Sequence, residues 1–222
     1  MPTDEFTQAR LHMVRIVAAY AEQTRAALPG GRLDERLLSA LARVPRHEFV
    51  PDELRPHAYA DGPLPIGFDK TISQPFMAAL MTGLLDVGAD HNVLEVGTGL
   101  GYHAALLASL CRRVCTIEII EELAAQARAN LDRFGYESVE SRIGDGSRGW
   151  PERAPFDRIL VAAGAEEAPP ALLDQLSPGG RMVIPLGPVD SQLMTLVEKA
   201  GDGTLRATEI MPVRFAVLES YH

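Results

Sequence analysis

A short glycine-rich segment sets the strongest constraint on the fold of this 222-residue chain. An apolar run at residues 93–96 is followed by glycines at 97, 99 and 101, and then by an alanine- and leucine-rich stretch. This order predicts a buried strand, a tight turn and a helix. Glycine suits such a turn because it adopts left-handed conformations and leaves the main chain bare. The segment therefore predicts a ligand-binding loop at the carboxyl end of a strand.

The glycine spacing separates several classes of nucleotide-binding protein. Dinucleotide-binding folds use G-x-G-x-x-G, whose third glycine would fall at Tyr102, and a phosphate-binding loop would end in Gly-Lys-Ser/Thr. An acid before G-x-G-x-G, here Glu95 before Gly97, instead resembles the first motif of S-adenosylmethionine-dependent methyltransferases. The resemblance implies S-adenosylmethionine as cofactor. Its predicted contacts in this segment are Glu95, Gly97, Thr98, Gly99, Gly101 and Tyr102.

Two more acids stand at the ends of predicted strands and extend the predicted cofactor site. Glu118 can accept hydrogen bonds from both ribose hydroxyls, and a solvated acid at a strand end is the alternative. Asp145 can accept from the adenine amine, although the glycines on either side of it also favour a simple tight turn. Ile119 and Gly146, next to these acids, are assigned to the same site.

Helical and strand periodicities alternate along the chain and predict an α/β fold. Expected helices lie at 6–28, after Asp34, from Gln74-Pro75 to 86, and at 102–110, 120–134 and 169–176. Expected strands lie at 93–96, 113–118, 139–143, 157–162, 181–186, 192–199 and 205–217, and residues 44–65 read as an ordered irregular loop. We predict a Rossmann-like, class I methyltransferase fold with a mostly parallel, doubly wound sheet, an antiparallel C-terminal edge and an N-terminal helical cap. Residues 1–75 would form the cap and substrate loop, and residues 76–222 the S-adenosylmethionine-binding core, packed as a single compact unit.

Composition and charge narrow the partners that we expect. The net charge is -9 and the 21 Lys and Arg residues form no run, which argues against a nucleic-acid partner. No apolar run approaches the roughly 18 residues of a membrane helix, and the first residues are acidic rather than basic, so we expect a cytoplasmic protein. The histidines lack metal-site spacing, and Cys111 and Cys115 read as small buried side chains. No metal and a monomer are expected.

Segments outside the glycine loop closely resemble the protein-L-isoaspartate O-methyltransferase family. The combination of Ile72-Ser73-Gln74-Pro75 with the glycine loop is highly specific, and the resemblance covers roughly residues 35 to 190. The matching segments are 44–51, 59–67, 71–75, 94–102, 144–150, 156–157 and 176–185.

The resemblance implies methylation of L-isoaspartyl carboxylates, and by extension D-aspartyl ones, in damaged peptides and proteins. The ester would cyclise to a succinimide that can reopen as normal aspartate. Ser73 matches the serine beside the substrate carboxylate, and an N-terminal helix cap is its alternative role. A carboxylate with a pKa near ~4 is already ionised, so it needs alignment rather than a general base. Substrate contacts are expected from Ile72, Ser73, Gln74, Ala216 and Val217.

Three departures from the family pattern bear on the substrate range. The Glu166-Glu167 pair would repel an acidic peptide if it lies near the site. Ala216-Val217 stands where the family commonly has Val-Pro, and 68–70 differ from the usual small or polar residues. Two other functions therefore stay open: a carboxyl methyltransferase for an ordinary aspartate or a small-molecule carboxylate, and a catalytically silent cofactor-binding adaptor.

Overall fold

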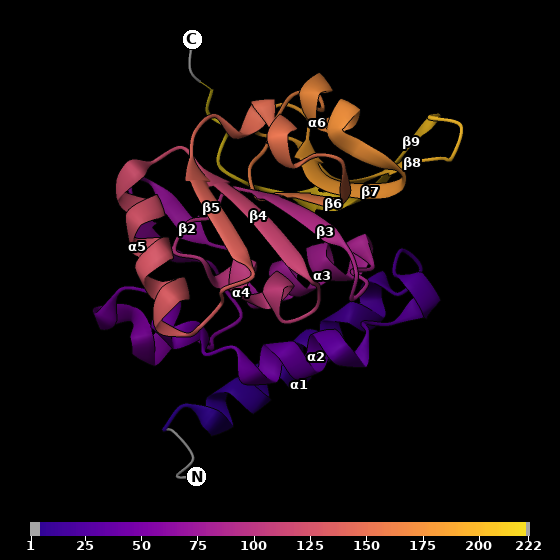
Figure 1. Ribbon diagram of the computed structural model, residues 1–222. Coiled ribbons are helices and arrows are strands. Elements are labelled where there is room, and N and C mark those ends of the chain that lie inside the picture. The colour runs from indigo at the N-terminus through magenta and orange to yellow at the C-terminus, as the bar shows by residue number, and fades with distance from the viewer. Residues whose placement is uncertain (1–4, 221–222) are drawn as a thin grey trace.

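A seven-stranded sheet forms the centre of the computed structural model, which describes residues 5–220 (Figure 1). The strand order is β5-β4-β3-β6-β7-β8-β9. The sheet strands are β3 (Asn92–Val96), β4 (Arg113–Glu118), β5 (Val139–Ile143), β6 (Phe156–Val161), β7 (Leu176–Leu186), β8 (Gln192–Lys199) and β9 (Leu205–Val213). The α-helices are α1 (Thr7–Ala21), α2 (Glu35–Arg43), α3 (Pro75–Leu85), α4 (Tyr102–Ala108), α5 (Glu121–Arg133) and α6 (Pro170–Gln175).

Pairing within the sheet follows the predicted pattern. The strands from β5 to β7 pair in parallel, whereas β7–β8 and β8–β9 pair antiparallel. Parallel strands need helical crossovers, and α4 and α5 supply those between β3, β4 and β5. The predicted α/β fold with an antiparallel C-terminal edge is therefore confirmed.

Side-chain alternation along the central strands explains why both faces of the sheet are covered. On β3, Val93 belongs to one hydrophobic cluster, whereas Leu94 and Val96 belong to another. Successive residues of a strand point to opposite faces, so both faces need a cover. Helices α1 to α4 lie on one side of the sheet, and α6 lies on the other (Figure 1).

The N-terminal helices pack onto the same hydrophobic cluster as the sheet. Met13 and Val17 of α1 and Leu41 of α2 join residues of α3 there, and all three are fully buried. The Asp34 side chain caps α2 by accepting a hydrogen bond from the backbone N–H of Arg36 at 2.7 Å, as predicted. The proposed division of the chain at residue 75 stays a prediction.

The structure corrects several predicted boundaries. The first helix does not extend over 6–28: it ends at Ala21 and continues as a 3₁₀ turn, η1 (Glu22–Thr24). Polar residues at 22–25 give that stretch no apolar stripe to bury. The predicted strands at 181–186 and 205–217 are instead Leu176–Leu186 and Leu205–Val213.

The stretch at 44–65, predicted to lack regular elements, contains short ordered ones. Two 3₁₀ helices, η3 (Arg46–Phe49) and η4 (Asp52–His57), each follow a proline. A hairpin of β1 (Leu64–Gly67) and β2 (Lys70–Ile72) comes next, and its turn residues Phe68 and Asp69 have φ values of 52° and 55°. Two consecutive positive φ angles are typical of a type I′ hairpin turn. The sequence did not predict this turn, because type I′ turns favour Asn-Gly or Asp-Gly rather than Phe-Asp.

Candidate functional site

One cavity of about 350 Å³ opens where the hairpin and α3 meet the carboxyl ends of β3 and β4. This is the edge at which open α/β sheets bind ligands. Most of the predicted site residues line it: Ile72, Ser73, Gln74, Gly97, Thr98, Gly99, Tyr102, Glu118, Ile119, Gly146, Ala216 and Val217. Glu95, Gly101 and Asp145 do not line the cavity.

The glycine loop needs its glycines for two different reasons. Gly97 and Gly99 have φ values of 93° and 57° and present bare backbone to the cavity. Gly101, at 95°, faces α5 instead, where a β-carbon would lie 3.2 Å from Leu131 Cγ. Gly101 therefore fits the loop against α5 rather than forming the cavity wall.

The Glu118 carboxylate is held at the cavity wall by three backbone N–H groups. Its Oε2 accepts from Gly99 at 2.8 Å, and its Oε1 accepts from Ile119 at 3.0 Å and Ile120 at 3.1 Å. A carboxylate has about four acceptor positions, so roughly one remains for a ligand hydroxyl. The contact of Glu118 with the ribose stays a prediction, and the carboxylate is oriented before any ligand binds.

Asp145 caps its own turn. Its Oδ1 accepts from the backbone N–H of Ser147 at 2.9 Å and from the Ser147 hydroxyl at 2.6 Å, and its Oδ2 lies 3.3 Å from Arg148 Nε. The contacts of Asp145 within residues 5–220 are therefore those of a tight turn, the alternative to a contact with adenine. Its neighbour Gly146 does line the cavity. A β-carbon at Gly146 would clash with Val96 Cγ1 of the central strand, so a glycine is required at this position.

Glu95 lies behind the cavity wall, connected to it by two threonines. The Thr98 and Thr116 hydroxyl oxygens are 2.6 Å apart, and Thr116 Oγ1 donates to Glu95 Oε2 at 2.5 Å. Glu95 is fully buried and its Oε1 has no partner within residues 5–220. Burial raises the pKa of Glu95 from 4.5 to about 8.

Replacing Glu95 by glutamine is expected to change the pH dependence of stability. The folded state holds the Glu95 proton up to pH about 8, whereas the unfolded chain releases it near the ordinary pKa of 4.5. The wild-type protein should therefore lose part of its free energy of unfolding as the pH rises from 4.5 to about 8. The E95Q variant has no titrating group at this position and should not show that loss. Thermal unfolding should give equal melting temperatures near pH 4 and an E95Q advantage of several degrees, about 3 °C or more, at pH 8. Melting curves with a constant difference across the range would contradict this assignment.

Ser73 lines the cavity with a free hydroxyl just before α3. The residue is half-buried, and its hydroxyl makes no hydrogen bond within the described residues 5–220. Its alternative role as a helix cap is wrong, because the cap position is Gln74 and the capping carboxylate comes from Asp61. Asp61 accepts from the backbone N–H of Phe76 at 3.0 Å and from Gln74 Nε2 at 2.7 Å. Ser73 is thus free to donate to a ligand.

Asp61 is a site residue to which the sequence assigned no role. The Asp61 carboxylate already occupies the positive end of α3, so that helix end is not open to an anionic substrate. Its fixed contact with Gln74 orients the chain next to Ser73. An acid twelve residues before the serine gave no local signal, because the loop between them brings the two together.

His103 also lines the cavity, but its environment keeps the imidazole neutral. Its Nε2 lies 2.8 Å from Thr82 Oγ1, and burial together with the Arg46 guanidinium lowers the pKa of His103 to about 3. Arg46 is fully buried, donates to the Ala58 carbonyl at 2.8 Å and lies 4.9 Å from the Tyr102 ring centroid. These contacts join η3 to the beginning of α4.

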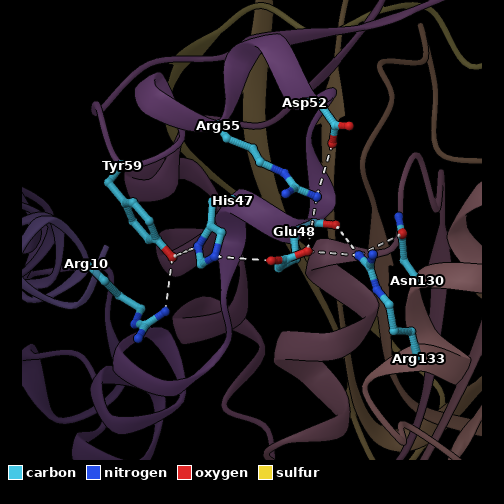
Figure 2. A network of polar contacts seen from close by, with 8 residues as sticks. All are labelled: Arg10, His47, Glu48, Asp52, Arg55, Tyr59, Asn130 and Arg133. Carbon is cyan, nitrogen blue, oxygen red and sulfur yellow. Dashed lines mark hydrogen bonds and ion pairs between the residues drawn. The ribbon is translucent and has the colours of Figure 1, made fainter. Parts of the chain in front are cut away.

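A polar network ties the η3–η4 segment to helix α5 (Figure 2). Glu48 Oε2 lies 3.3 Å from Arg55 Nη2 and 3.1 Å from Arg133 Nη2, and the figure shows the carboxylate between the two guanidinium groups. Asn130, one helical turn from Arg133 on α5, donates to the carbonyl of Leu100 at 3.1 Å. Helix α5 therefore contacts both the η3–η4 segment and the loop.

The C-terminal segment closes one wall of the cavity through backbone pairing that the predicted long strand did not anticipate. Gly164 exchanges backbone hydrogen bonds with Ala216 and Leu218, each at 2.7 Å. The buried Gln192 side chain bonds both the N–H and the carbonyl of Phe215. Ala216 and Val217 are thereby held at the cavity.

The acidic pair and the two cysteines singled out from the sequence lie outside the cavity lining. Glu166 and Glu167 are exposed but do not line the cavity, so the expected repulsion at the mouth does not arise from them. Cys111 and Cys115 are buried free thiols. Within residues 5–220 there is no cluster of His, Cys, Asp and Glu able to hold a metal. No helix in that range is long and apolar enough to cross a membrane.

Comparison with solved structures places the chain among methyltransferases of known fold. A protein-L-isoaspartate O-methyltransferase superimposes with a TM-score of 0.80 at 28% identity, covering 94% of this chain and 65% of its own. A Plasmodium falciparum protein, described as a protein-L-isoaspartate O-methyltransferase in complex with S-adenosyl-L-homocysteine, gives a TM-score of 0.77 at 21% identity. That match covers 96% of this chain and 99% of the other.

Relatives found by sequence are more similar to this chain than those two solved structures, and the similarity extends over nearly the whole chain. A Polaromonas sp. relative named "Protein-L-isoaspartate O-methyltransferase 1" is 51% identical over 219 residues, which are 99% of this chain and 93% of the relative. A Syntrophobacter fumaroxidans relative named "Protein-L-isoaspartate O-methyltransferase 2" is 51% identical over 220 residues, which are 99% of this chain and 89% of the relative. The family model described as "Protein-L-isoaspartate(D-aspartate) O-methyltransferase" matches residues 27–221. Since both the family model and these relatives match nearly the whole chain, it belongs to the protein-L-isoaspartate(D-aspartate) O-methyltransferase family.

Proposed function

We propose that this chain transfers the methyl group of S-adenosylmethionine to the free carboxylate of L-isoaspartyl residues, and of D-aspartyl residues, in damaged proteins. Family membership supports the reaction. The observation that carries the proposal for these residues is the placement of the free Ser73 hydroxyl in the same cavity as Gly97, Gly99 and Glu118. One cavity thus contains the candidate groups for both substrates.

The residues present fit the cofactor. The cavity volume, about 350 Å³, lies within the usual range for small-molecule sites, about 300–1,000 Å³. Gly97 and Gly99 would lie against the nucleoside, and Glu118 would accept from a ribose hydroxyl. When bound, S-adenosylmethionine supplies an electrophilic methyl group on a sulfonium. Thr98, Tyr102, Ile119 and Gly146 would complete the cofactor site, whereas Glu95, Gly101 and Asp145 would support it from behind.

Ser73 would orient the acceptor rather than activate it. A carboxylate near neutral pH is already an anionic nucleophile, so no proton has to be removed before methyl transfer. A neutral hydroxyl can donate to one carboxylate oxygen and leave the other free for in-line attack. Ile72, Gln74, Ala216 and Val217 form the walls on either side and would exclude water from the acceptor.

The product chemistry accounts for a repair role. The methyl ester has a better leaving group than the free acid, so the neighbouring amide nitrogen closes a succinimide and releases methanol. Hydrolysis of the succinimide can regenerate an ordinary aspartyl linkage. The enzyme therefore only needs to make the ester, in agreement with a site that provides orientation and no acid–base pair.

A single assay tests the proposal. The purified chain is incubated with methyl-labelled S-adenosylmethionine and two peptides that differ only in one isoaspartyl or aspartyl linkage, and base-labile methyl ester is counted. We expect label on the isoaspartyl peptide alone. Label on the aspartyl peptide would favour a carboxyl methyltransferase with another acceptor. Cofactor binding without label on either would favour a silent binding module.

A further inference from the structure

An ion pair connects the two walls of the cavity mouth. Lys70 Nζ on β2 lies 2.5 Å from Glu219 Oε1 of the C-terminal segment, 149 residues further along the chain. Both residues line the cavity, and their side chains are 24% and 49% exposed. The pair therefore sits at the boundary between the cavity and solvent.

The position of this pair lies on the expected path of a peptide substrate. Lys70 precedes Ser73 by three residues, and Glu219 follows Val217 by two. An extended chain advances about 3.3 Å per residue, so Lys70 begins within roughly 10 Å of Ser73. A peptide whose acceptor carboxylate lies at Ser73 would bring a residue two or three positions away to Lys70.

At the mouth of the cavity, more positively than negatively charged side chains are available to a ligand. Arg214 is exposed, lines the same cavity and forms no ion pair with any residue between 5 and 220. Glu118, the other acid of the cavity wall, already accepts three backbone hydrogen bonds. Among residues 5–220, Glu219 is the one acid left at the entrance to balance Lys70 and Arg214.

The Lys70–Glu219 contact is of a kind that a ligand can replace. An ion pair between two partly exposed, flexible side chains contributes little net stability, because water solvates both charges and ordering the side chains costs entropy. A substrate carboxylate at the same place would restore the same charge contact. Replacing the Glu219 carboxylate by a substrate carboxylate at Lys70 therefore changes the free energy little.

Resting on the proposed function, we propose that Glu219 occupies in the free protein the place of a substrate carboxylate. Lys70, with Arg214 beside the same cavity, then recognises an acidic side chain two or three residues from the isoaspartyl group. The preferred substrates are isoaspartyl peptides with an acidic flank. Lys70 and Glu219 are specificity-determining residues and take no part in methyl transfer.

The test uses isoaspartyl peptides in pairs, one with a single glutamate and its twin with a glutamine at the same place. That place is two or three residues before the isoaspartyl residue (−2, −3) or two or three residues after it (+2, +3). The measured quantity is the ratio of kcat/KM for the glutamate peptide to that for its glutamine twin. The variants are Lys70→Met, which keeps the aliphatic stem, and Glu219→Gln, which releases Lys70. Matched controls are Arg128→Met and Asp132→Asn, which remove the same charges from an exposed ion pair on α5 outside the cavity.

We expect a ratio above one at one or more positions for the wild type. The ratio should rise about 3-fold or more in E219Q, because the competing carboxylate is gone. It should fall towards one in K70M, in which only Arg214 remains to attract the glutamate. It should stay at the wild-type value in both controls, and the E219Q gain should shrink as salt is raised from about 0.05 to 0.5 M.

Two results would overturn the inference while leaving the proposed function intact. One is a ratio that is the same in all five proteins at every position, with the glutamine peptides still methylated. The other is a change in D132N as large as that in E219Q, which would assign the effect to net charge. No methyl ester on any isoaspartyl peptide would overturn the proposed function and this inference together.

Discussion

Replacing Gly97 by alanine is expected to lower S-adenosylmethionine affinity by about 30-fold or more. Gly97 has a φ of 93°, and a side chain in left-handed backbone costs roughly 1–2 kcal/mol. Relief of that strain would turn the loop backbone, which bonds the Ile117 carbonyl through the Gly97 N–H at 2.9 Å. The added methyl group would also extend from a residue that lines the cavity. Titration calorimetry with S-adenosylmethionine measures the change.

Gly203→Ala is the matched control for this substitution. Gly203 has a φ of 87° in the turn between β8 and β9, and a β-carbon there would meet nothing within 4 Å. The two variants carry a similar backbone strain, so their melting temperatures should fall by similar amounts. Only G97A should lose cofactor affinity. Equal affinities in G97A, G203A and wild type would remove Gly97 from the proposed cofactor site.

Replacing Ser73 by alanine is expected to lower methyl transfer to an isoaspartyl peptide by roughly 10-fold or more. The substitution removes one oriented donor from the acceptor carboxylate, and removal of a single such donor from a preorganised site has effects of this order or larger. Cofactor affinity should change by less than about 2-fold, because the hydroxyl has no partner within residues 5–220 whose position depends on it. The measurement combines initial rates of ester formation with calorimetric cofactor binding.

Ser177→Ala provides the corresponding control. Ser177 on β7 is half-buried like Ser73 but lies outside the cavity. S177A should keep both the wild-type rate and the wild-type affinity. Full activity in S73A would exclude Ser73 from the mechanism, whereas a parallel loss of cofactor affinity would assign it to the cofactor site instead.

Local sequence was sufficient wherever neighbouring residues determine the structure. The apolar run, the alternating glycines and the helix after Tyr102 form consecutive elements, so the strand, loop and helix were predicted correctly. The family, the fold, the methyltransferase activity and the cofactor predicted from the motifs are confirmed. Roles of individual site residues, the monomeric state, the cytoplasmic location and the lack of a nucleic-acid partner stay predictions.

Contacts between residues far apart in the sequence determined the cap of α3, and strand packing determined the position of Glu95. Asp61 rather than Ser73 caps α3, because the η4–β1 connection brings Asp61 back to the first turn of that helix. Glu95 sits behind the wall rather than in it, because alternation along β3 turns its side chain to the same face as Val93. Neither outcome is visible in a window of neighbouring residues.

The chain's sequence by itself determined the element types of the central sheet and its helices, the glycine loop and the family, but not the 3₁₀ helices and the hairpin before Ser73. Those features depend on periodicity, backbone conformation and short motifs, all of which act over a few residues. Only the tertiary structure brought Lys70 to Glu219, Gly164 to Ala216 and Asp61 to Gln74. Such pairs depend on how the hairpin and the C-terminal segment pack around one cavity, and packing is a property of the whole chain rather than of any segment.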